Sequence, residues 1–295
     1  MDCIQTSNKL LLVRPTELVK FQDKEIKDLI NYQFNDLVST LERHQINIMV
    51  FDSAPQARAS VFPNNWISSH VNRRTKEKKV VLYPMENSLR RLERRSPVMD
   101  YILNDDSVTK IINLSDYELE GQFLESTGAF VLDRVNKIAY CGVAKKANSH
   151  LAFEWGRLMN YTIIEFETID WNRKPVYHTN IMMTIGEQYV IICSEVIKFP
   201  EEKEMVLSSL KKSGRRIITI TMDQMHHFCG NCLQVRNRSN RLVGCLSQRA
   251  YESFQPKQLA LLESYCDGGL AVVEYSMLEY FGGGSIRCSL LEYGF

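Results

Sequence analysis

The sequence predicts an α/β protein in which one unit, made of two strands, a helix and a third strand, occurs five times and closes into a ring. Three observations support this fold class. Four copies of the unit follow one another along the middle of the chain, a fifth is divided between its two ends, and polar residues recur at the start of each copy at nearly equal intervals. Repetition at a steady period is typical of repeated supersecondary units.

The four complete copies are defined by β-branched runs between turn residues and by apolar residues at helical spacing. The clearest copy has its strand, turn, strand, helix and strand at 128–134, 135–137, 138–143, 147–159 and 161–166. Two later copies place their strands and helix at 180–185, 189–193, 200–212 and 216–221, and at 231–237, 242–247, 256–266 and 270–275. An earlier copy occupies 64–69, 78–85, 88–103 and 110–114.

The fifth copy joins the two ends of the chain. Segments 285–293 and 10–13 supply its first two strands, and a helix near 17–43 and the strand 46–51 complete it. This copy closes the ring. The alternative is an open α/β sheet. The residues that begin the five units lie at positions 65, 125, 178, 231 and 288, which are 60, 53, 53 and 57 positions apart. Loops at the same end of repeated units converge on one cavity, so these residues are predicted to meet.

The composition indicates a single globular domain over residues 1–295. Hydrophobic residues make up 44% of the chain, which is enough to bury a large core. The 36 Lys and Arg against 35 Asp and Glu give a net charge of +1. No global field therefore favours nucleic acid or an anionic membrane, and a small molecule is the expected partner.

The chain ends and the cysteines indicate a cytoplasmic protein. The first apolar stretch is too short for the core of a signal peptide, and no segment has the length of a membrane span. The eight cysteines show no framework spacing, so we expect free thiols in a reducing compartment.

A cysteine near the C-terminus is the candidate nucleophile. Cys288 follows the run Gly282-Gly283-Gly284, which permits close approach of backbone to a ligand, and the adjacent Arg287 favours its thiolate. His178 and Glu125 begin two other units and are the candidate acid/base and carboxylate. Considered singly, each of the three residues could also have a purely structural role, Cys288 as a buried thiol, His178 as a histidine at a strand end and Glu125 as a solvated carboxylate in a turn.

Six segments, read in order, resemble the signature blocks of a known family. They are the segments 62–70, 83–95, 124–134, 177–186, 228–235 and 282–292. The chain resembles the amidinotransferase-like proteins called citrulline-utilisation hydrolases, of the pentein or guanidino-group-modifying superfamily, which are related to arginine deiminase, dimethylarginine dimethylaminohydrolase and glycine amidinotransferase. The blocks cover nearly the whole chain.

The resemblance implies a five-bladed α/β propeller with a cysteine, a histidine and an acidic residue in its central channel. Matched by position, Cys288 is the nucleophile, His178 the acid/base and Glu125 the carboxylate of the site. The thiolate would add to the planar carbon of a guanidinium or ureido group, and the imidazolium would protonate the departing amine. We expect an amino acid as substrate and no metal or organic cofactor. The protein could also form a homo-oligomer.

Two asparagines depart from the arginine-processing relatives. Those relatives hold the guanidinium with aspartates at the positions of Asn65 and Asn180. An asparagine offers an acceptor and an NH2 donor, which matches a neutral ureido group, so the site favours citrulline over arginine. Glu125 remains a negative charge that would still suit a guanidinium.

Other positions bear on substrate binding. Asn64 and Asn231 join the candidate substrate-binding residues, and Arg90 and Arg91 match an arginine-rich block that offers planar forks to the substrate carboxylate. The resembling family has an aspartate where this chain has Ala59. It also has an arginine in the loop occupied here by Ala144-Lys145-Lys146.

Three function classes stay open at this stage. The first is hydrolysis of a carbon-nitrogen bond in a ureido or guanidino amino acid, the second is amidino transfer to an amine, and the third is a binding or regulatory protein with a degenerate site, suggested by Ala59 and Lys146. Cys229 and Cys232, with His226 and His227 upstream, imitate a zinc site, but no second ligand pair accompanies them, so no metal site is predicted.

Overall fold

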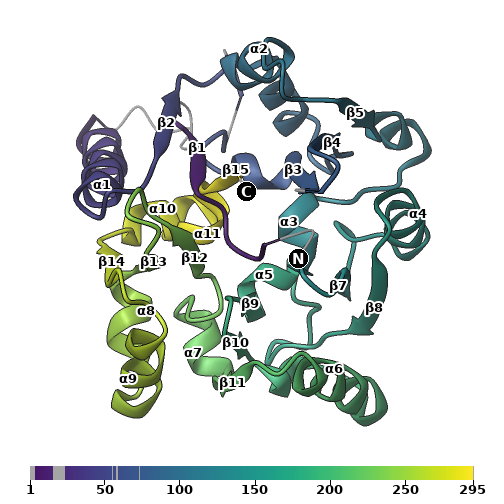
Figure 1. The fold of residues 1–295 in the computed structure, drawn as a ribbon, viewed down its shortest axis with the longest axis vertical. Coiled ribbons are helices and arrows are strands. Elements are labelled where there is room, and N and C mark those ends of the chain that lie inside the picture. The colour runs from purple at the N-terminus through teal and green to yellow at the C-terminus, as the bar shows by residue number, and fades with distance from the viewer. Residues whose placement is uncertain (1–3, 16–23, 55, 58, 73, 295) are drawn as a thin grey trace.

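Five small sheets surround a central axis in the computed structural model, which describes residues 4–15, 24–54, 56–57, 59–72 and 74–294 (Figure 1). Each sheet has three strands. Its middle strand pairs antiparallel with the strand next to it in the ring interior and parallel with the third strand. The expected five-bladed α/β propeller is therefore confirmed.

The first sheet, blade 1, is built from both ends of the chain. It contains β15 (Leu291–Gly294), β1 (Lys9–Val13) and β2 (Ile48–Phe51), with α1 (Lys24–Arg43) as its helix. Buried residues of α1 recur at helical spacing, at Ile30, Phe34, Leu37 and Leu41. This closure confirms the predicted fifth copy. The start of its helix was predicted near residue 17, and residues 16–23 lie outside the described part of the chain.

The other four blades follow in chain order. Blade 2 contains β3 (Ile67–Asn72), β4 (Glu77–Leu82), β5 (Lys110–Asn113), the 3-10 helix η2 (Arg90–Arg95) and α2 (Pro97–Leu103). Blade 3 contains β6 (Phe130–Asp133), β7 (Ile138–Val143), β8 (Thr162–Glu167) and α4 (Ser149–Met159). Blade 4 contains β9 (Met183–Ile185), β10 (Tyr189–Ile192), β11 (Arg216–Thr219) and α6 (Pro200–Lys212).

Blade 5 completes the ring. It contains β12 (Leu233–Arg236), β13 (Leu242–Ser247), β14 (Leu270–Val273), α8 (Gln248–Ser253) and α9 (Pro256–Ser264). Connecting segments add η3 (Ser115–Glu120), η4 (Ser194–Val196), α7 (Met222–His226) and α10 (Ser276–Gly282). The helices α1, α2, α4, α6 and α9 lie at the outside of the ring in Figure 1, one on each blade. No helix among the described residues is long and apolar enough to cross a membrane.

One predicted helix is divided in two. The sequence analysis placed a single helix at 88–103, whereas η2 ends at Arg95 and α2 begins at Pro97. Ser96 between them is extended, with ψ of 159°. The residue before a proline is pushed out of the helical region by the pyrrolidine ring, and proline at the first helical position needs no N–H partner.

Four one-turn helices stand where the sequence analysis predicted the beginnings of strands. They are η1 (Pro63–Asn65), α3 (Ser126–Ala129), α5 (Thr179–Met182) and α11 (Ile286–Ser289). Figure 1 shows α3, α5 and α11 around the centre of the ring. Glu125 and His178 are the N-cap residues of α3 and α5, and Cys288 lies within α11. These turns therefore place the predicted site residues at the ring centre.

The N-terminal segment 4–8 crosses the same centre (Figure 1). Gln5, Thr6 and Ser7 are buried although all three are polar. The Gln5 amide donates to the carbonyls of Leu132 and Ile185, and Thr6 donates to Glu187. In addition, the segment's backbone bonds to residues 236 and 294. It therefore joins blades 1, 3, 4 and 5 across the end of the channel.

Candidate active site

Cys288 is a buried free thiol in the turn α11. The glycine run before it has a steric reason, because a Cβ added at Gly284 would lie 3.1 Å from the Cys288 Cβ and 3.2 Å from its Sγ. Gly283 adopts φ of 69°, in the left-handed region that favours glycine. The run therefore lets the chain turn tightly against the thiol.

Two asparagine amides surround the Cys288 sulfur. The Nδ2 atom of Asn231 lies 3.4 Å from Sγ and that of Asn180 lies 3.7 Å from it. Burial raises the pKa of the Cys288 thiol, and the Asn231 hydrogen bond and the Arg287 charge oppose that effect only in part. The resting protein therefore holds mainly the neutral thiol at neutral pH, with two N–H donors ready to stabilise a thiolate.

His178 and Glu125 form a buried pair. The Nε2 atom of His178 lies 2.8 Å from Oε2 of Glu125, and both side chains are at most 3% exposed. Burial favours a neutral Glu125, but the His178 hydrogen bond, Arg90 and Lys146 outweigh it and lower the pKa of this carboxyl to about 2. An ionised carboxylate only accepts hydrogen bonds, so Nε2 of His178 carries the proton and Nδ1 is the basic nitrogen.

The imidazole is mainly neutral in the resting protein. Burial lowers the pKa of His178, and the hydrogen bond to Glu125 offsets this only in part. Its ring lies against the backbone of Gly128, where an added Cβ would lie 3.1 Å from Nδ1 and 2.5 Å from Oδ1 of Asn65. Gly128 therefore allows the Asn65 amide and the His178 ring to approach the same point.

Glu125 has partners at both of its oxygens. Oε1 accepts the backbone N–H of Glu86 at 3.3 Å, while Oε2 lies 3.5 Å from Nζ of Lys146 and 3.8 Å from Nη1 of Arg90 in addition to its bond with His178. The sequence analysis treated this carboxylate as a charge still able to hold a guanidinium. In the structure its charge is already shared by two cations.

Arg90 connects Glu125 to a second buried carboxylate. Its Nε and Nη2 donate to the two oxygens of Glu93 at 2.8 and 3.2 Å, and Nη2 also donates to the Phe62 carbonyl. Burial raises the pKa of Glu93 to about 7, although Arg90 acts to lower it. Arg90 is thereby held rigidly beside the site. The sequence analysis missed Glu93, although its spacing of three residues from Arg90 on a helical segment was a usable signal.

Three asparagine oxygens are buried without a hydrogen-bond partner among the described residues. They are the Oδ1 atoms of Asn64, Asn65 and Asn231. An acceptor left unpaired in the interior costs about 1–3 kcal/mol. Such atoms are suited to receive N–H groups from a ligand, and two of them belong to residues already placed beside His178 and Cys288.

The predicted site residues form two groups of contacting side chains, and the turn α5 connects the two groups. Glu125, His178 and Arg90 make the first group, and Cys288, Asn180 and Asn231 make the second. The two are linked because His178 caps the turn that contains Asn180. Tyr177 adds a further link, since its hydroxyl donates to the carbonyl of Gly283.

Arg91 lies apart from both groups. Its Nε donates to the Met85 carbonyl and is 3.3 Å from Oε2 of Glu118, which also pairs with Arg94. Of the two arginines predicted to hold the substrate carboxylate, only Arg90 contacts a residue of the candidate pair His178 and Glu125. A role of Arg91 in substrate binding stays a prediction.

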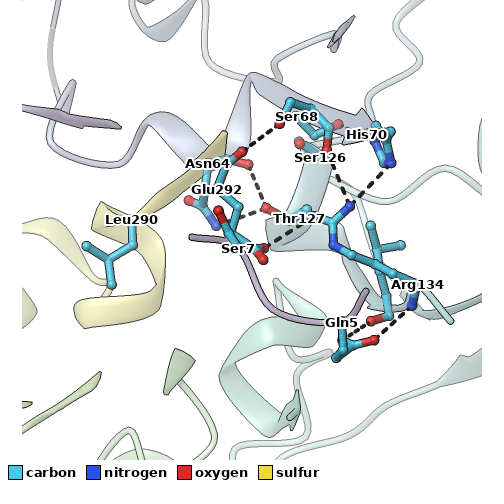
Figure 2. Close-up of polar contacts among 12 residues, drawn as sticks. Gln5, Ser7, Asn64, Ser68, His70, Ser126, Thr127, Arg134, Leu290 and Glu292 are labelled. Carbon is cyan, nitrogen blue, oxygen red and sulfur yellow. Dashed lines mark hydrogen bonds and ion pairs between the residues drawn. The ribbon is translucent and has the colours of Figure 1, made fainter. Parts of the chain in front are cut away.

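A buried polar network lies beside the Cys288 turn. Arg287 and Arg134 both bond to Oε2 of Glu292, at 2.8 and 3.3 Å. Figure 2 shows Arg134 extending from Gln5 of the N-terminal segment toward His70, to which its guanidinium bonds. A small cavity of about 30 Å³ lies among these groups and is also lined by Asn180. The ion pair with Glu292 fixes the guanidinium of Arg287, the residue that directly precedes Cys288.

Solved structures with a similar fold include an arginine dihydrolase and a DDAH. The N-terminal domain of ArgZ, an arginine dihydrolase from the ornithine-ammonia cycle in cyanobacteria, superposes with a TM-score of 0.70 at 12% identity, covering 96% of this chain and 97% of that one. A DDAH from Pseudomonas aeruginosa, solved as a cysteine-to-serine mutant complexed with citrulline, gives 0.67 at 14% identity, with 98% and 100% covered. At these identities the likeness establishes the fold.

Longer chains also match. AgrE, solved as a cysteine-to-alanine mutant with L-arginine, gives a TM-score of 0.71 at 13% identity, and the match covers 96% of this chain but 40% of that one. No curated protein sequence matches the chain significantly. The family model described as N,N dimethylarginine dimethylhydrolase, eukaryotic, matches residues 15–294. The chain therefore belongs to this family and is a cysteine-dependent hydrolase of the pentein superfamily.

Proposed function

We propose that this single-domain protein hydrolyses a carbon-nitrogen bond of a ureido or guanidino amino acid, with citrulline as the favoured substrate. The observation that carries this proposal is that Cys288 contacts two asparagine amides, one of them on the turn α5, whose N-cap residue His178 forms a buried pair with Glu125. A thiol, an oriented imidazole and neutral amide groups suit nucleophilic attack on a planar, nitrogen-rich carbon.

In this scheme Cys288 attacks the ureido carbon of citrulline. His178, whose Nδ1 is unprotonated at rest, accepts the thiol proton, and the Nδ2 groups of Asn180 and Asn231 stabilise the thiolate. The new C–S bond forms as a C–N bond breaks, and the imidazolium returns the proton to the departing amine. Water, activated by His178, then breaks the C–S bond, which restores the thiol and releases a carbamic acid. The carbamic acid loses carbon dioxide, and this breaks the second C–N bond. The sum is citrulline plus water giving ornithine, ammonia and carbon dioxide.

Glu125 is an orienting group in this scheme. It fixes the His178 tautomer through the bond to Nε2 and stabilises the imidazolium that forms during the reaction. Asn64 and Asn65 would accept N–H groups of the substrate, since their buried oxygens lack other partners among the described residues. Arg90, and in our proposal Arg91, would hold the substrate carboxylate.

Two features support a neutral substrate. The acceptors near the thiol are amides rather than carboxylates, and the carboxylate of Glu125 already faces Arg90 and Lys146. A guanidinium would enter this site without an unshared negative charge to receive it. A ureido group needs only hydrogen bonds.

The test is to incubate purified protein with citrulline, arginine and N,N-dimethylarginine and to assay the products. Dimethylarginine is included because the matching family model is described by that substrate. Ornithine and ammonia from citrulline are the expected result. Efficient formation of citrulline from arginine or from dimethylarginine, with citrulline itself left intact, would contradict the substrate preference. Transfer of an amidino group to an added amine would indicate the alternative reaction class.

The two asparagines that replace aspartates provide a prediction about specificity. Asn65→Asp together with Asn180→Asp is expected to raise the arginine-to-citrulline ratio of kcat/KM by roughly ten-fold or more, because each carboxylate favours a cation and lacks the NH2 donor that a ureido carbonyl needs. Steady-state kinetics on both substrates measures the ratio. A ratio that stays the same in the double variant would mean that these asparagines have a structural role only.

A further inference from the structure

Lys146 occupies a place in the site that the catalytic scheme does not use. Its Nζ lies 3.5 Å from Oε2 of Glu125 and 5.9 Å from the ring centre of Tyr177. The backbone of Lys146 is held beside that of Glu125, because the Glu125 N–H donates to the Lys146 carbonyl at 2.9 Å and the turn 144–147 is closed by a hydrogen bond of its own. Lys146 is therefore built into the same structural unit as Glu125.

Lys146 is one of two cations that face the Glu125 carboxylate. The other, Arg90, is also paired with Glu93, and His178 is mainly neutral at rest. Lys146 therefore adds to the neutralising charge that Arg90 shares with Glu93. Removing the Lys146 ammonium would make the surroundings of Glu125 more negative by one charge, which attracts a cation.

We propose that Lys146 is a specificity-determining residue that neutralises Glu125 and thereby excludes a cationic guanidinium in favour of a neutral ureido group. This inference rests on the proposed function, in which His178 and Glu125 act beside the substrate. Lys146 repels the guanidinium directly and also withdraws the carboxylate that would pair with it. A neutral ureido group experiences neither effect.

The neighbouring lysine provides a matched control. Lys145 carries the same charge one residue earlier, but its side chain is 75% exposed and it pairs with Glu86 at 2.6 Å. The Lys146 side chain is 27% exposed and faces the buried Glu125. Salt and water screen the interactions of an exposed charge strongly and those of a partly buried charge much less. Substituting each lysine by methionine therefore makes the same chemical change in two electrostatic settings.

The experiment measures substrate preference with and without turnover. Lys146→Met, Lys146→Arg and Lys145→Met are each made in the native chain and in a Cys288→Ala background. Kinetics in the first set gives the arginine-to-citrulline ratio of kcat/KM, and calorimetry in the second gives the ratio of the two affinities. Lys146→Met is expected to raise both ratios about ten-fold, because one repelling charge is lost from a weakly screened site. Lys146→Arg and Lys145→Met should stay within about two-fold of the parent protein.

The outcomes separate this inference from the proposed function. Failure of the native chain to turn over either amino acid would overturn the proposed function, while the affinity ratios in the Cys288→Ala proteins still report on Lys146. Unchanged ratios in Lys146→Met overturn the inference, as does an equal shift in Lys146→Arg. An equal loss of affinity for both amino acids in Lys146→Met also overturns it, because that would show Lys146 holding the carboxylate that both share. Thermal melting of every variant identifies loss of fold.

Discussion

Cys288→Ala is expected to abolish turnover while leaving the fold intact. The thiol is the only nucleophile in the proposed scheme, and loss of a covalent nucleophile typically lowers kcat by about 10⁴-fold or more. The side chain is buried among Asn180, Asn231 and Gly284, so alanine leaves a small void and no unpaired charge. Single-turnover and steady-state assays with citrulline, together with thermal melting, measure the two parts of this expectation.

Cys141→Ala is the matched control. Cys141 is also a buried free thiol, in β7, where it pairs with Phe130 across the sheet and lies outside the candidate site. Its substitution should leave kcat/KM within a few-fold of the parent. Activity in Cys288→Ala above about one per cent of the parent would remove Cys288 from the nucleophile's role.

The second large effect is expected from Glu125→Gln, which should lower kcat by about 10² to 10⁴-fold. The variant keeps the size of the side chain but replaces the carboxylate that accepts from Nε2–H of His178 by a neutral amide, which cannot stabilise the imidazolium by charge and can turn its NH2 group toward Nε2. Loss of a carboxylate with this role has cost about 10⁴ in another triad. An Asp133→Asn variant tests the specificity of the effect, since Asp133 is equally buried and paired, with Arg215, but is the last residue of β6, at the opposite end of that strand from the turn α3 that Glu125 caps. A ten-fold or smaller loss in Glu125→Gln would contradict the orienting role.

The same carboxyl predicts a pH dependence of stability. Its pKa is about 2 in the folded protein against 4.5 as the reference value. A lowered pKa means that the ionised form is favoured by folding, so this stabilisation is present above pH 4.5 and is lost as the pH falls toward 2. The drop in unfolding free energy over that range should be smaller in Glu125→Gln than in the parent, as measured by denaturant titration.

The blades were predictable from the sequence because their signals are local. The runs that became β7, β10 and β13 are apolar and bounded by turn residues, and α4 and α6 begin within two residues of the predicted positions. The one-turn helices were not predicted because a single turn spans too few residues to show helical periodicity. They were assigned to the strands that follow them. The break at Pro97, by contrast, was readable from proline chemistry alone.

The sequence predicted that His178 and Glu125 lie together, and the structure shows this contact. The sequence did not predict which cations face Glu125. Cys288 stood out by its glycine run, and the equal intervals predicted that distant residues meet. The contact of Lys146 with Glu125 depends on the direction of a flexible side chain from a different turn, which no spacing rule supplies. The same holds for Arg91, which belongs to the same arginine-rich block as Arg90 but extends to Glu118 instead.

The closure of blade 1 has a consequence for how the protein matures. β1 pairs with β2 on one side and with β15 on the other, so the second of these pairings forms only after residues 291–294 have been synthesised. Contacts of such large sequence separation form late, since the entropy of closing the loop must be met first. Cys288 lies on the turn directly before β15. We therefore expect Cys288 to reach its place late in folding. A nascent chain that stops before residue 291 contains the residues of blades 2 to 5 but lacks the strand β15 that holds the Cys288 turn in blade 1.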